Sequence, residues 1–286
     1  MVNKKFKKTY LNVKDHSVSG QTFQLRYNET FDFLETFPQP SPEQLPKYYK
    51  TKDYISHTDS QRNLFEKVYH TVRRLALKKK LKLINSLALK EKKILDVGCG
   101  TGDFLKTAQE HNWIVTGIEP NDNARAIANK KTNNSVFKVD HLLKLEQQSY
   151  DVITLWHVLE HLPNLNEHMS IFKSLLKPSG TLIIAVPNYK SYDAKYYKEF
   201  WAAYDAPRHL WHFSQAAISK LIAKEEMKVF KTLPMKFDSY YVSLLSEKYK
   251  SGWMNIFNAF RIGWLSNFKA KQSTEYSSLI YCIKNI

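Results

Sequence analysis

Short apolar runs alternate with amphipathic segments along most of the chain after residue 92. The apolar runs are rich in Val, Ile and Leu and predict buried strands, whereas apolar positions three and four residues apart predict helices. The expected strands cover 93–97, 113–118, 135–139, 150–156 and 181–186, and the expected helices cover 104–110, 124–130, 165–176 and 214–224. This alternation predicts a doubly wound α/β domain, in which helices cover both faces of a mostly parallel sheet.

The N-terminal part of the chain follows a different pattern. Apolar residues at helical spacing predict one long helix over 60–87, so the N-terminal part is expected to be helical just before the α/β domain begins. Residues 1–58 are expected to be irregular, apart from a short strand over 23–27 and a brief helix over 42–49. We therefore expect an N-terminal extension over 1–58 and one folded domain over 59–286.

The C-terminal part carries a helical insert before its last strand. Strands are expected over 228–232 and 278–283, and the aromatic-rich segment between them, over about 240–273, has a helical pattern. Its large side chains form one apolar stripe and are Trp253, Phe257, Phe260 and Trp264. We expect the insert to act as a lid whose stripe packs on its own domain, with peripheral contact to an anionic membrane as the alternative.

Charge and cysteine content narrow the class of protein. The formal net charge is +16, which attracts anions such as nucleic acid, acidic lipid headgroups or phosphorylated substrates, although lysines spread over a solvated surface would give the same total. The chain lacks the concentrated arginine stripe of a nucleic-acid domain. Its two cysteines are too few for a disulfide framework or a four-cysteine zinc site. With neither a signal peptide nor a membrane span in the pattern, we expect a cytoplasmic protein.

The strongest chemical signal is a glycine-rich turn in the segment ILDVGCGTGDFL, residues 94–105. An apolar strand ends there, Gly98, Gly100 and Gly102 follow, and a helix begins at once. Such a turn lies at the carboxyl end of a strand, where open α/β sheets bind ligands, and glycine lets a ligand approach the backbone. Glu119 ends the next strand about twenty residues beyond the first glycine, where an acid can accept hydrogen bonds from both ribose hydroxyls.

The spacing of the glycines indicates which nucleotide binds. A dinucleotide fingerprint places its third glycine three positions after the second, but here the interval is two. Asp96 lies just before the turn, where it would repel a pyrophosphate and could pair with an ammonium group. S-adenosylmethionine has an amino group, a ribose and no phosphate, so the residues favour it as the cofactor.

Residues 92–190 resemble the class I S-adenosylmethionine-dependent methyltransferases. The resemblance rests on the LDVGCGTG loop, the acid that ends the second strand, Asp140 after the third strand and YDVITLWHVLEHL around the fourth. The later AVPN and DAPRHLWHFS segments resemble bacterial small-molecule methyltransferases of the domain 23 type, related to quinone-type O-methyltransferases. The resemblance implies a Rossmann-like sheet of seven strands, the last of them antiparallel.

The resemblance also implies the cofactor contacts. Asp96 and the glycine loop would hold the methionine part, Glu119 the ribose, and Asp140 with His141 the adenine edge. The full set of expected cofactor-binding residues is Asp96, Gly98, Cys99, Gly100, Thr101, Gly102, Glu119, Pro120, Asp140, His141, Trp156 and His157. Some relatives carry cysteine pairs for a metal in the N-terminal segment, but residues 1–58 contain no cysteine, and we expect no metal site.

The segment His157-Val158-Leu159-Glu160-His161 matches a zinc-peptidase pattern, H-x-x-E-H. That chemistry needs both histidines on one face of a helix, whereas this segment leaves a strand and is soon followed by Pro163. We therefore expect His157 to form a wall of the cofactor site beneath the sulfonium, and Glu160 and His161 to have structural roles.

A second cluster, Asp205 to Ser214, follows the fifth strand and faces the cofactor crevice. His209 suits the role of a base for a hydroxyl or enol, because histidine titrates near neutrality. Arg208 could hold an anionic acceptor with two hydrogen bonds. We predict His209, His157 and Arg208 as the catalytic residues, with structural hydrogen bonding of the histidines as the alternative.

The sequence thus predicts an S-adenosylmethionine-dependent methyltransferase that acts on a small-molecule or lipid-like acceptor at oxygen. One alternative is an RNA or protein methyltransferase, motivated by the charge of +16. The chain has no Asn-Pro-Pro-Tyr-type tetrapeptide after the fourth strand and no cysteine placed for covalent base methylation, and both observations disfavour nucleic acid. The other alternative is a non-catalytic module that only binds S-adenosylmethionine.

Overall fold

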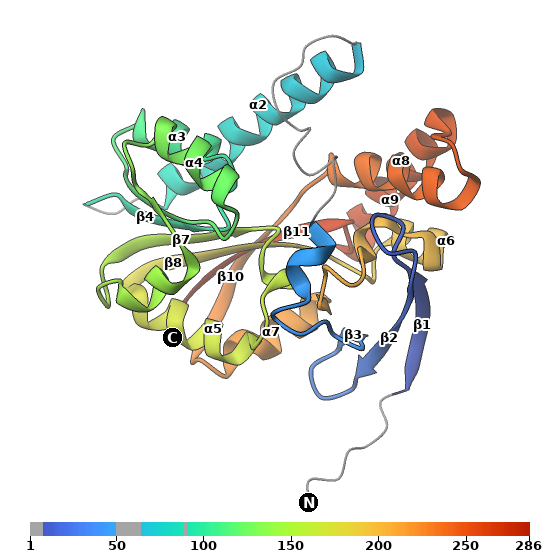
Figure 1. The fold of residues 1–286 in the computed structure, drawn as a ribbon, viewed down its shortest axis with the longest axis horizontal. Coiled ribbons are helices and arrows are strands. Elements are labelled where there is room, and N and C mark those ends of the chain that lie inside the picture. Colours follow the sequence, from blue (N-terminus) through green and yellow to red (C-terminus); the bar gives the residue numbers. More distant parts are fainter. Residues whose placement is uncertain (1–7, 50–63, 88–90) are drawn as a thin grey trace, which may run out of the picture.

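The computed structural model describes residues 8–49, 64–87 and 91–286. Its main sheet has seven strands in the order β10-β11-β8-β7-β4-β5-β6 (Figure 1). The strands are β4 (Lys93–Val97), β5 (Ile114–Ile118), β6 (Val136–Phe137), β7 (Tyr150–Trp156), β8 (Leu176–Pro187), β10 (Met227–Pro234) and β11 (Ser278–Asn285). Neighbouring strands from β6 to β8 are parallel, and β11 is antiparallel to both β8 and β10. The predicted sheet, including its antiparallel last strand, is confirmed.

Helices cover both faces of this sheet because its strands alternate their apolar side chains between two cores. On one face, Leu95 and Ile153 pack with residues of α5 (Leu165–Leu175) and α7 (Gln215–Ala223). On the other face, the neighbouring Ile94 and Val152 pack with α2, α3 and α4. These helices are α2 (Leu64–Ser86), α3 (Asp103–Gln109) and α4 (Asp122–Lys131). The predicted start of the long helix at residue 60 and the domain boundary after residue 58 lie outside the described residues.

The N-terminal extension differs from the prediction, because it forms a second sheet rather than an irregular segment. Strands β1 (Thr9–Lys14), β2 (Thr22–Asn28) and β3 (Phe33–Phe37) form an antiparallel meander, followed by a 3-10 helix η1 (Leu45–Tyr49). The fourth strand of this sheet, β9 (Trp211–His212), comes from much later in the chain, after β8, and pairs with β3. A short strand whose partner lies so far away leaves little local signal in the sequence.

The insert consists of two helices that connect β10 to β11. They are α8 (Asp238–Ser251) and α9 (Ile256–Ser273), and they lie at one corner of the molecule (Figure 1). The predicted packing of the aromatic stripe on its own domain is wrong, because Trp253, Phe257, Phe260 and Trp264 are all exposed. Trp253 lies in the turn before α9 rather than on the helix. Among the described residues, no helix is long and apolar enough to cross a membrane.

Candidate functional site

The glycine-rich turn joins the end of β4 to the start of α3, as predicted. Gly98 and Gly100 have positive φ angles of 67° and 56°, in the region that favours glycine. A Cβ on Gly98 would lie 2.5 Å from Cγ2 of Val158, whereas a Cβ on Gly100 would meet nothing within 4 Å. The first glycine is therefore required by packing against the segment after β7, and the second presents bare backbone to open space.

Glu119, at the end of β5, organises this turn. Its carboxylate is buried and accepts hydrogen bonds from the backbone N–H groups of Gly100 at 2.8 Å and Asn121 at 2.9 Å. Burial raises the pKa of Glu119, and these two hydrogen bonds oppose the rise. Asn121 caps α4 through its side chain, which accepts from the N–H of Ala124. One carboxylate thus ties the glycine turn to the start of the next helix, and its bond to ribose hydroxyls stays a prediction.

Asp96 lies in β4 beneath the turn and is also buried. Its Oδ1 accepts a hydrogen bond of 2.6 Å from the Thr154 hydroxyl. Burial raises the pKa of Asp96 to about 7, although this bond and the positive charge of Lys80 lower it. The Lys80 ammonium comes from α2 and lies 4.3 Å from the ring centroid of Trp156. Asp96 therefore already has a cation in its surroundings, which would compete with the ammonium group that is predicted to pair with Asp96.

The other predicted cofactor residues lie on the loops that follow β4, β5, β6 and β7. Thr101 donates its hydroxyl to the Asp103 carboxylate at 3.1 Å, and burial raises the pKa of the Cys99 thiol. Beyond β6, the His141 ring stacks on Phe137 with centroids 4.1 Å apart, while Asp140 is exposed. Pro120 is exposed after Glu119, and Trp156 ends β7. Because carboxyl ends of parallel strands meet at one edge of the sheet, these residues all lie toward that edge, and their contacts with a cofactor stay a prediction.

His157 follows β7 with a φ angle of 56° and lies between two carboxylates. Its Nε2 is 3.1 Å from Oδ2 of Asp238, and its Nδ1 is 3.4 Å from Oε1 of Glu160. Burial disfavours the charged ring, but these two carboxylates outweigh burial and raise the pKa of His157 to about 10. His157 is therefore an imidazolium at neutral pH and cannot serve as a base in this arrangement.

The two predicted motifs, H-x-x-E-H and the loop after the fifth strand, pack directly on each other. The N–H of Leu210 donates to the carbonyl oxygen of Glu160 at 2.8 Å, and Nδ1 of His161 donates to the carbonyl oxygen of Arg208 at 3.0 Å. The rings of His161 and His209 are 4.5 Å apart. Residues 159–161 form a single 3-10 turn, so His157 lies outside any helix that contains His161. The strand-to-loop geometry expected for this segment is present.

His209 and Arg208 have distinct surroundings. His209 is buried, and its Nδ1 donates to the carbonyl oxygen of Ala203 at 2.9 Å, which leaves Nε2 with its lone pair. Burial lowers the pKa of His209 to about 4, so the ring is neutral at pH 7. The Arg208 guanidinium donates to Asp205 at 2.5 Å and to the Ser17 hydroxyl at 3.0 Å. Arg208 therefore has a carboxylate partner already, and it joins the loop to the N-terminal sheet.

The same region contains a group that could bind a metal ion. One oxygen of Glu160 and one nitrogen each of His161 and His209 lie within 4.8 Å of one another. Glu160 is buried, and neither of its oxygens accepts a hydrogen bond within the part of the chain that the structure describes. This trio is not recognisable in the sequence, because His209 comes from a distant loop.

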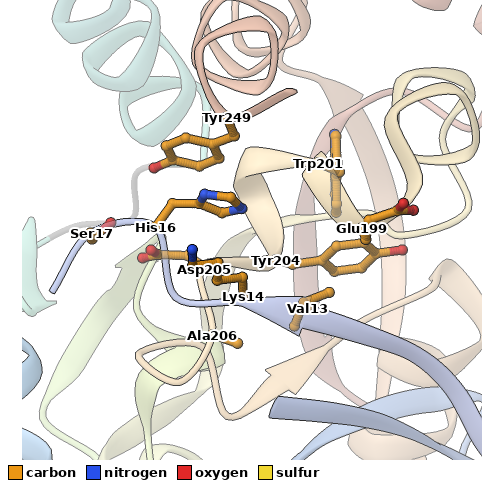
Figure 2. A pocket seen from close by; sticks show the side chains of 10 residues that line it. All are labelled: Val13, Lys14, His16, Ser17, Glu199, Trp201, Tyr204, Asp205, Ala206 and Tyr249. Atoms are coloured by element: carbon orange, nitrogen blue, oxygen red, sulfur yellow. The ribbon is translucent and has the colours of Figure 1, made fainter. Parts of the chain in front are cut away.

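A small cavity lies next to Asp205, between the N-terminal sheet and α8 (Figure 2). The ring of His16 stacks on that of Tyr249, with centroids 4.4 Å apart and planes 8° from parallel. Ser17 and Asp205, both partners of Arg208, also line the cavity. Sequence reasoning missed His16, Ser17 and Tyr249, as it missed Asp238, because nothing local in their segments marks them as neighbours of this loop.

Comparisons with known proteins agree with this geometry. Residues 61–229, more than half of the chain, match the methyltransferase domain family. The chain is similar to ubiquinone biosynthesis O-methyltransferases from Saccharophagus degradans, with 33% identity over 34% of this chain and 44% of that protein, and from Coxiella burnetii, with 30% identity over 37% and 49%. The matched part thus spans less than half the length of these curated relatives.

Solved structures of other proteins are similar to this chain in their overall fold. Magnesium protoporphyrin IX methyltransferase from Synechocystis, with SAH bound, superimposes with a TM-score of 0.54 at 16% identity over 80% of this chain and 91% of that one. Geranyl diphosphate methyltransferase in complex with SAM gives a TM-score of 0.57 at 12% identity over 79% and 93%. Asp96 and Glu119 are buried beside the glycine turn, and their contacts with the cofactor stay a prediction. The chain belongs to the methyltransferase domain family.

Proposed function

We propose that this enzyme methylates a hydroxyl oxygen of a small-molecule or lipid-like acceptor. The observation that carries the proposal is the packing of the Arg208–His209 loop on the segment after β7, beside His157. This arrangement puts a neutral imidazole and an arginine next to the expected sulfonium wall. The ubiquinone biosynthesis O-methyltransferases, which are about 30% identical over a third of the chain, support oxygen as the methylated atom.

When bound, S-adenosylmethionine supplies a methyl group that is attached to a positively charged sulfur. The acceptor oxygen bonds to this methyl group, the S–C bond breaks, and the cofactor leaves as a neutral thioether. The acceptor hydroxyl loses its proton in the same reaction. In this proposal Nε2 of His209 accepts that proton, since Nδ1 is held as a donor by the Ala203 carbonyl. A pKa of about 4 suffices, because the hydroxyl proton becomes strongly acidic as the new O–C bond forms. Arg208 orients the acceptor, and its partner Asp205 fixes the guanidinium in place.

The proposal is tested with purified protein, S-adenosylmethionine carrying a labelled methyl group, and phenolic acceptors with and without isoprenoid tails. Mass spectrometry should find the label on a hydroxyl oxygen. His209→Ala should then lower kcat by about 10²–10⁴-fold, the usual contribution of a general base. Its matched control is His111→Ala, at an exposed histidine remote from this loop, which should leave kcat unchanged. Binding of S-adenosylmethionine should survive in both variants.

Two results would contradict the proposal. Transfer of the label to RNA or protein, with none to any hydroxyl compound, would show that the acceptor is a macromolecule and not a small molecule or lipid. An unchanged kcat in both His209→Ala and Arg208→Ala would show that these residues do not form the acceptor side, and it would leave the assignment of the cofactor site unaffected.

A further inference from the structure

The outer face of the insert is covered by large apolar side chains. Phe257 is 91% exposed, Trp253 61% and Phe260 58%, values unusual for aromatic residues of a folded domain. We call the exposed set in this turn and helix the aromatic face; it consists of Trp253, Met254, Ile256, Phe257, Phe260, Trp264 and Phe268. Contiguous exposed apolar surface of this kind marks a site of contact with another surface.

The orientation of α9 is fixed by its opposite side, which is built from small residues. Ala259, Gly263, Ser266 and Ala270 are all buried. A Cβ on Gly263 would lie 2.8 Å from Cδ1 of Tyr240, so the backbones of α8 and α9 approach closely there. At 3.6 residues per turn, Phe257, Trp264 and Phe268 fall on the side opposite these small residues, and Phe260 falls on the flank. The helix therefore directs its large side chains outward, because its small residues occupy the side that packs against α8.

Exposed cations lie on the helix that carries the aromatic face and near the end of α8. Helix α9 contains no aspartate or glutamate, and its three cations, Arg261, Lys269 and Lys271, are all exposed. Lys248 and Lys250, near the end of α8, are exposed as well. A helix with outward Trp and Phe, cationic flanks and no acids has the composition of helices that lie in the headgroup region of a bilayer. Trp is especially suited to that region, where one side of the ring is wet and the other is apolar.

We propose that the aromatic face docks the enzyme on an anionic lipid bilayer, with α9 lying in the plane of the membrane surface. The occupant follows from charge complementarity: acidic headgroups match Arg261, Lys271 and the overall charge of +16, while the acyl boundary accepts the aromatic rings. The proposal needs no knowledge of the methyl acceptor and stands apart from the proposed function.

The insert also connects this face to the catalytic side of the molecule. Helix α8 begins at Asp238, whose carboxylate lies 3.1 Å from Nε2 of His157. The turn with Trp253 follows the other end of α8 (Figure 1). A bilayer bound at the aromatic face would thus lie one helix length from the site.

The experiment is sedimentation of the full-length protein with vesicles of phosphatidylcholine alone or of phosphatidylcholine mixed with phosphatidylglycerol. We expect binding to the anionic vesicles that weakens when salt rises from about 0.1 M to about 0.5 M, because salt screens the charges. Phe257→Ser combined with Trp264→Ser should lower the partition coefficient by at least about tenfold, since each side chain loses its apolar contact with lipid. Arg261→Glu with Lys271→Glu should lower binding to the anionic vesicles by a similar factor.

The matched control replaces two exposed apolar side chains elsewhere, Ile114→Ser and Phe230→Ser, and should bind vesicles like the wild type. Circular dichroism and cofactor binding check that every variant is folded. Equal sedimentation of the wild type with both kinds of vesicle, or of the Phe257/Trp264 variant and the control, would overturn the proposal. Sedimentation velocity without lipid supplies a further refutation: self-association that depends on the aromatic face, with no vesicle binding, would assign the face to a second copy of this chain.

Discussion

Glu119→Gln removes one oxygen from the carboxylate that ties the glycine turn to α4. In the wild type, its two oxygens accept hydrogen bonds from the N–H groups of Gly100 and Asn121 at 2.8 and 2.9 Å. The amide of glutamine has one oxygen and one NH2 group, so one of these N–H groups would face a donor. The Glu119 carboxylate is buried and Gly100 and Asn121 are half-buried, so water can replace the lost acceptor only in part.

The loss of folding stability caused by Glu119→Gln can be calculated from these two hydrogen bonds. A hydrogen bond to a charged acceptor contributes about 1.5–3 kcal/mol, and a buried donor left without a partner costs about 1–3 kcal/mol. Removing the buried charge recovers part of its desolvation, since burial already raises the pKa of Glu119. Since the two N–H donors are half-buried, we expect the free energy of unfolding to fall by roughly 1–3 kcal/mol. Binding of S-adenosylmethionine should weaken as well, because the ribose loses a charged acceptor and the turn loses its order.

Urea unfolding followed by circular dichroism measures the first effect, and calorimetric titration measures the second. The control is Glu110→Gln at the end of α3, where the side chain is exposed and the expected change is below about 0.5 kcal/mol. If Glu119→Gln unfolds at the same urea concentration as this control and binds the cofactor like the wild type, the assigned role of Glu119 is wrong.

Three further predictions concern the same site. Because burial raises the folded-state pKa of Asp96 to about 7, folding takes up a proton, and the free energy of unfolding should fall as pH rises from about 4 to about 7. Cofactor affinity should instead rise as Asp96 ionises through about pH 7. Asp96→Asn should make both the free energy of unfolding and the cofactor affinity less dependent on pH. If both quantities change with pH in the variant as they do in the wild type, the role assigned to Asp96 is wrong. Gly98→Ala should cost about 2–4 kcal/mol in urea unfolding through its collision with Val158, and Gly100→Ala only about 1 kcal/mol; equal losses would refute the packing argument. Lys80→Met should strengthen cofactor binding severalfold in calorimetry by removing a cation that competes for Asp96, and weaker binding would show that Lys80 assists the cofactor.

The arrangement of the glycine turn, Asp96 and Glu119 could be predicted from the sequence because these residues have a recognisable local pattern. A strand, a glycine turn and a helix follow one another within residues 93–109, and Glu119 is one strand further on. In a parallel sheet, such neighbouring segments necessarily meet at the carboxyl edge of the strands. Position along the chain therefore suffices to assemble Asp96, the turn and Glu119.

The surroundings of the proposed acceptor residues could be predicted only in part, since they are assembled from distant segments. The sequence singled out Arg208 and His209, but their partners Ser17 and Ala203 depend on how the N-terminal sheet docks. The protonated state of His157 depends on Asp238, which comes from the insert. A side chain's pKa follows from its surroundings, and these surroundings were not visible in the local pattern.

The aromatic stripe shows a different limit of sequence reasoning. Its helical spacing correctly predicted a helix, yet the apolar face of a helix usually packs inward. Here the small residues Ala259, Gly263 and Ala270 take the inward side, and their close packing against α8 leaves the aromatic rings outside. Periodicity identifies two faces, but only the tertiary structure decides which of them is buried.

The central claim is that the turn between β4 and α3, with Asp96 and Glu119, binds S-adenosylmethionine. The most direct measurement is calorimetric titration of the purified protein with S-adenosylmethionine, its demethylated product and NAD, together with an Asp96→Ala variant. The account predicts binding of the first two with affinity in the micromolar range, about −8 kcal/mol, loss of that binding in the variant, and no binding of NAD. Binding of NAD in preference to S-adenosylmethionine, or unchanged binding by Asp96→Ala, would contradict it.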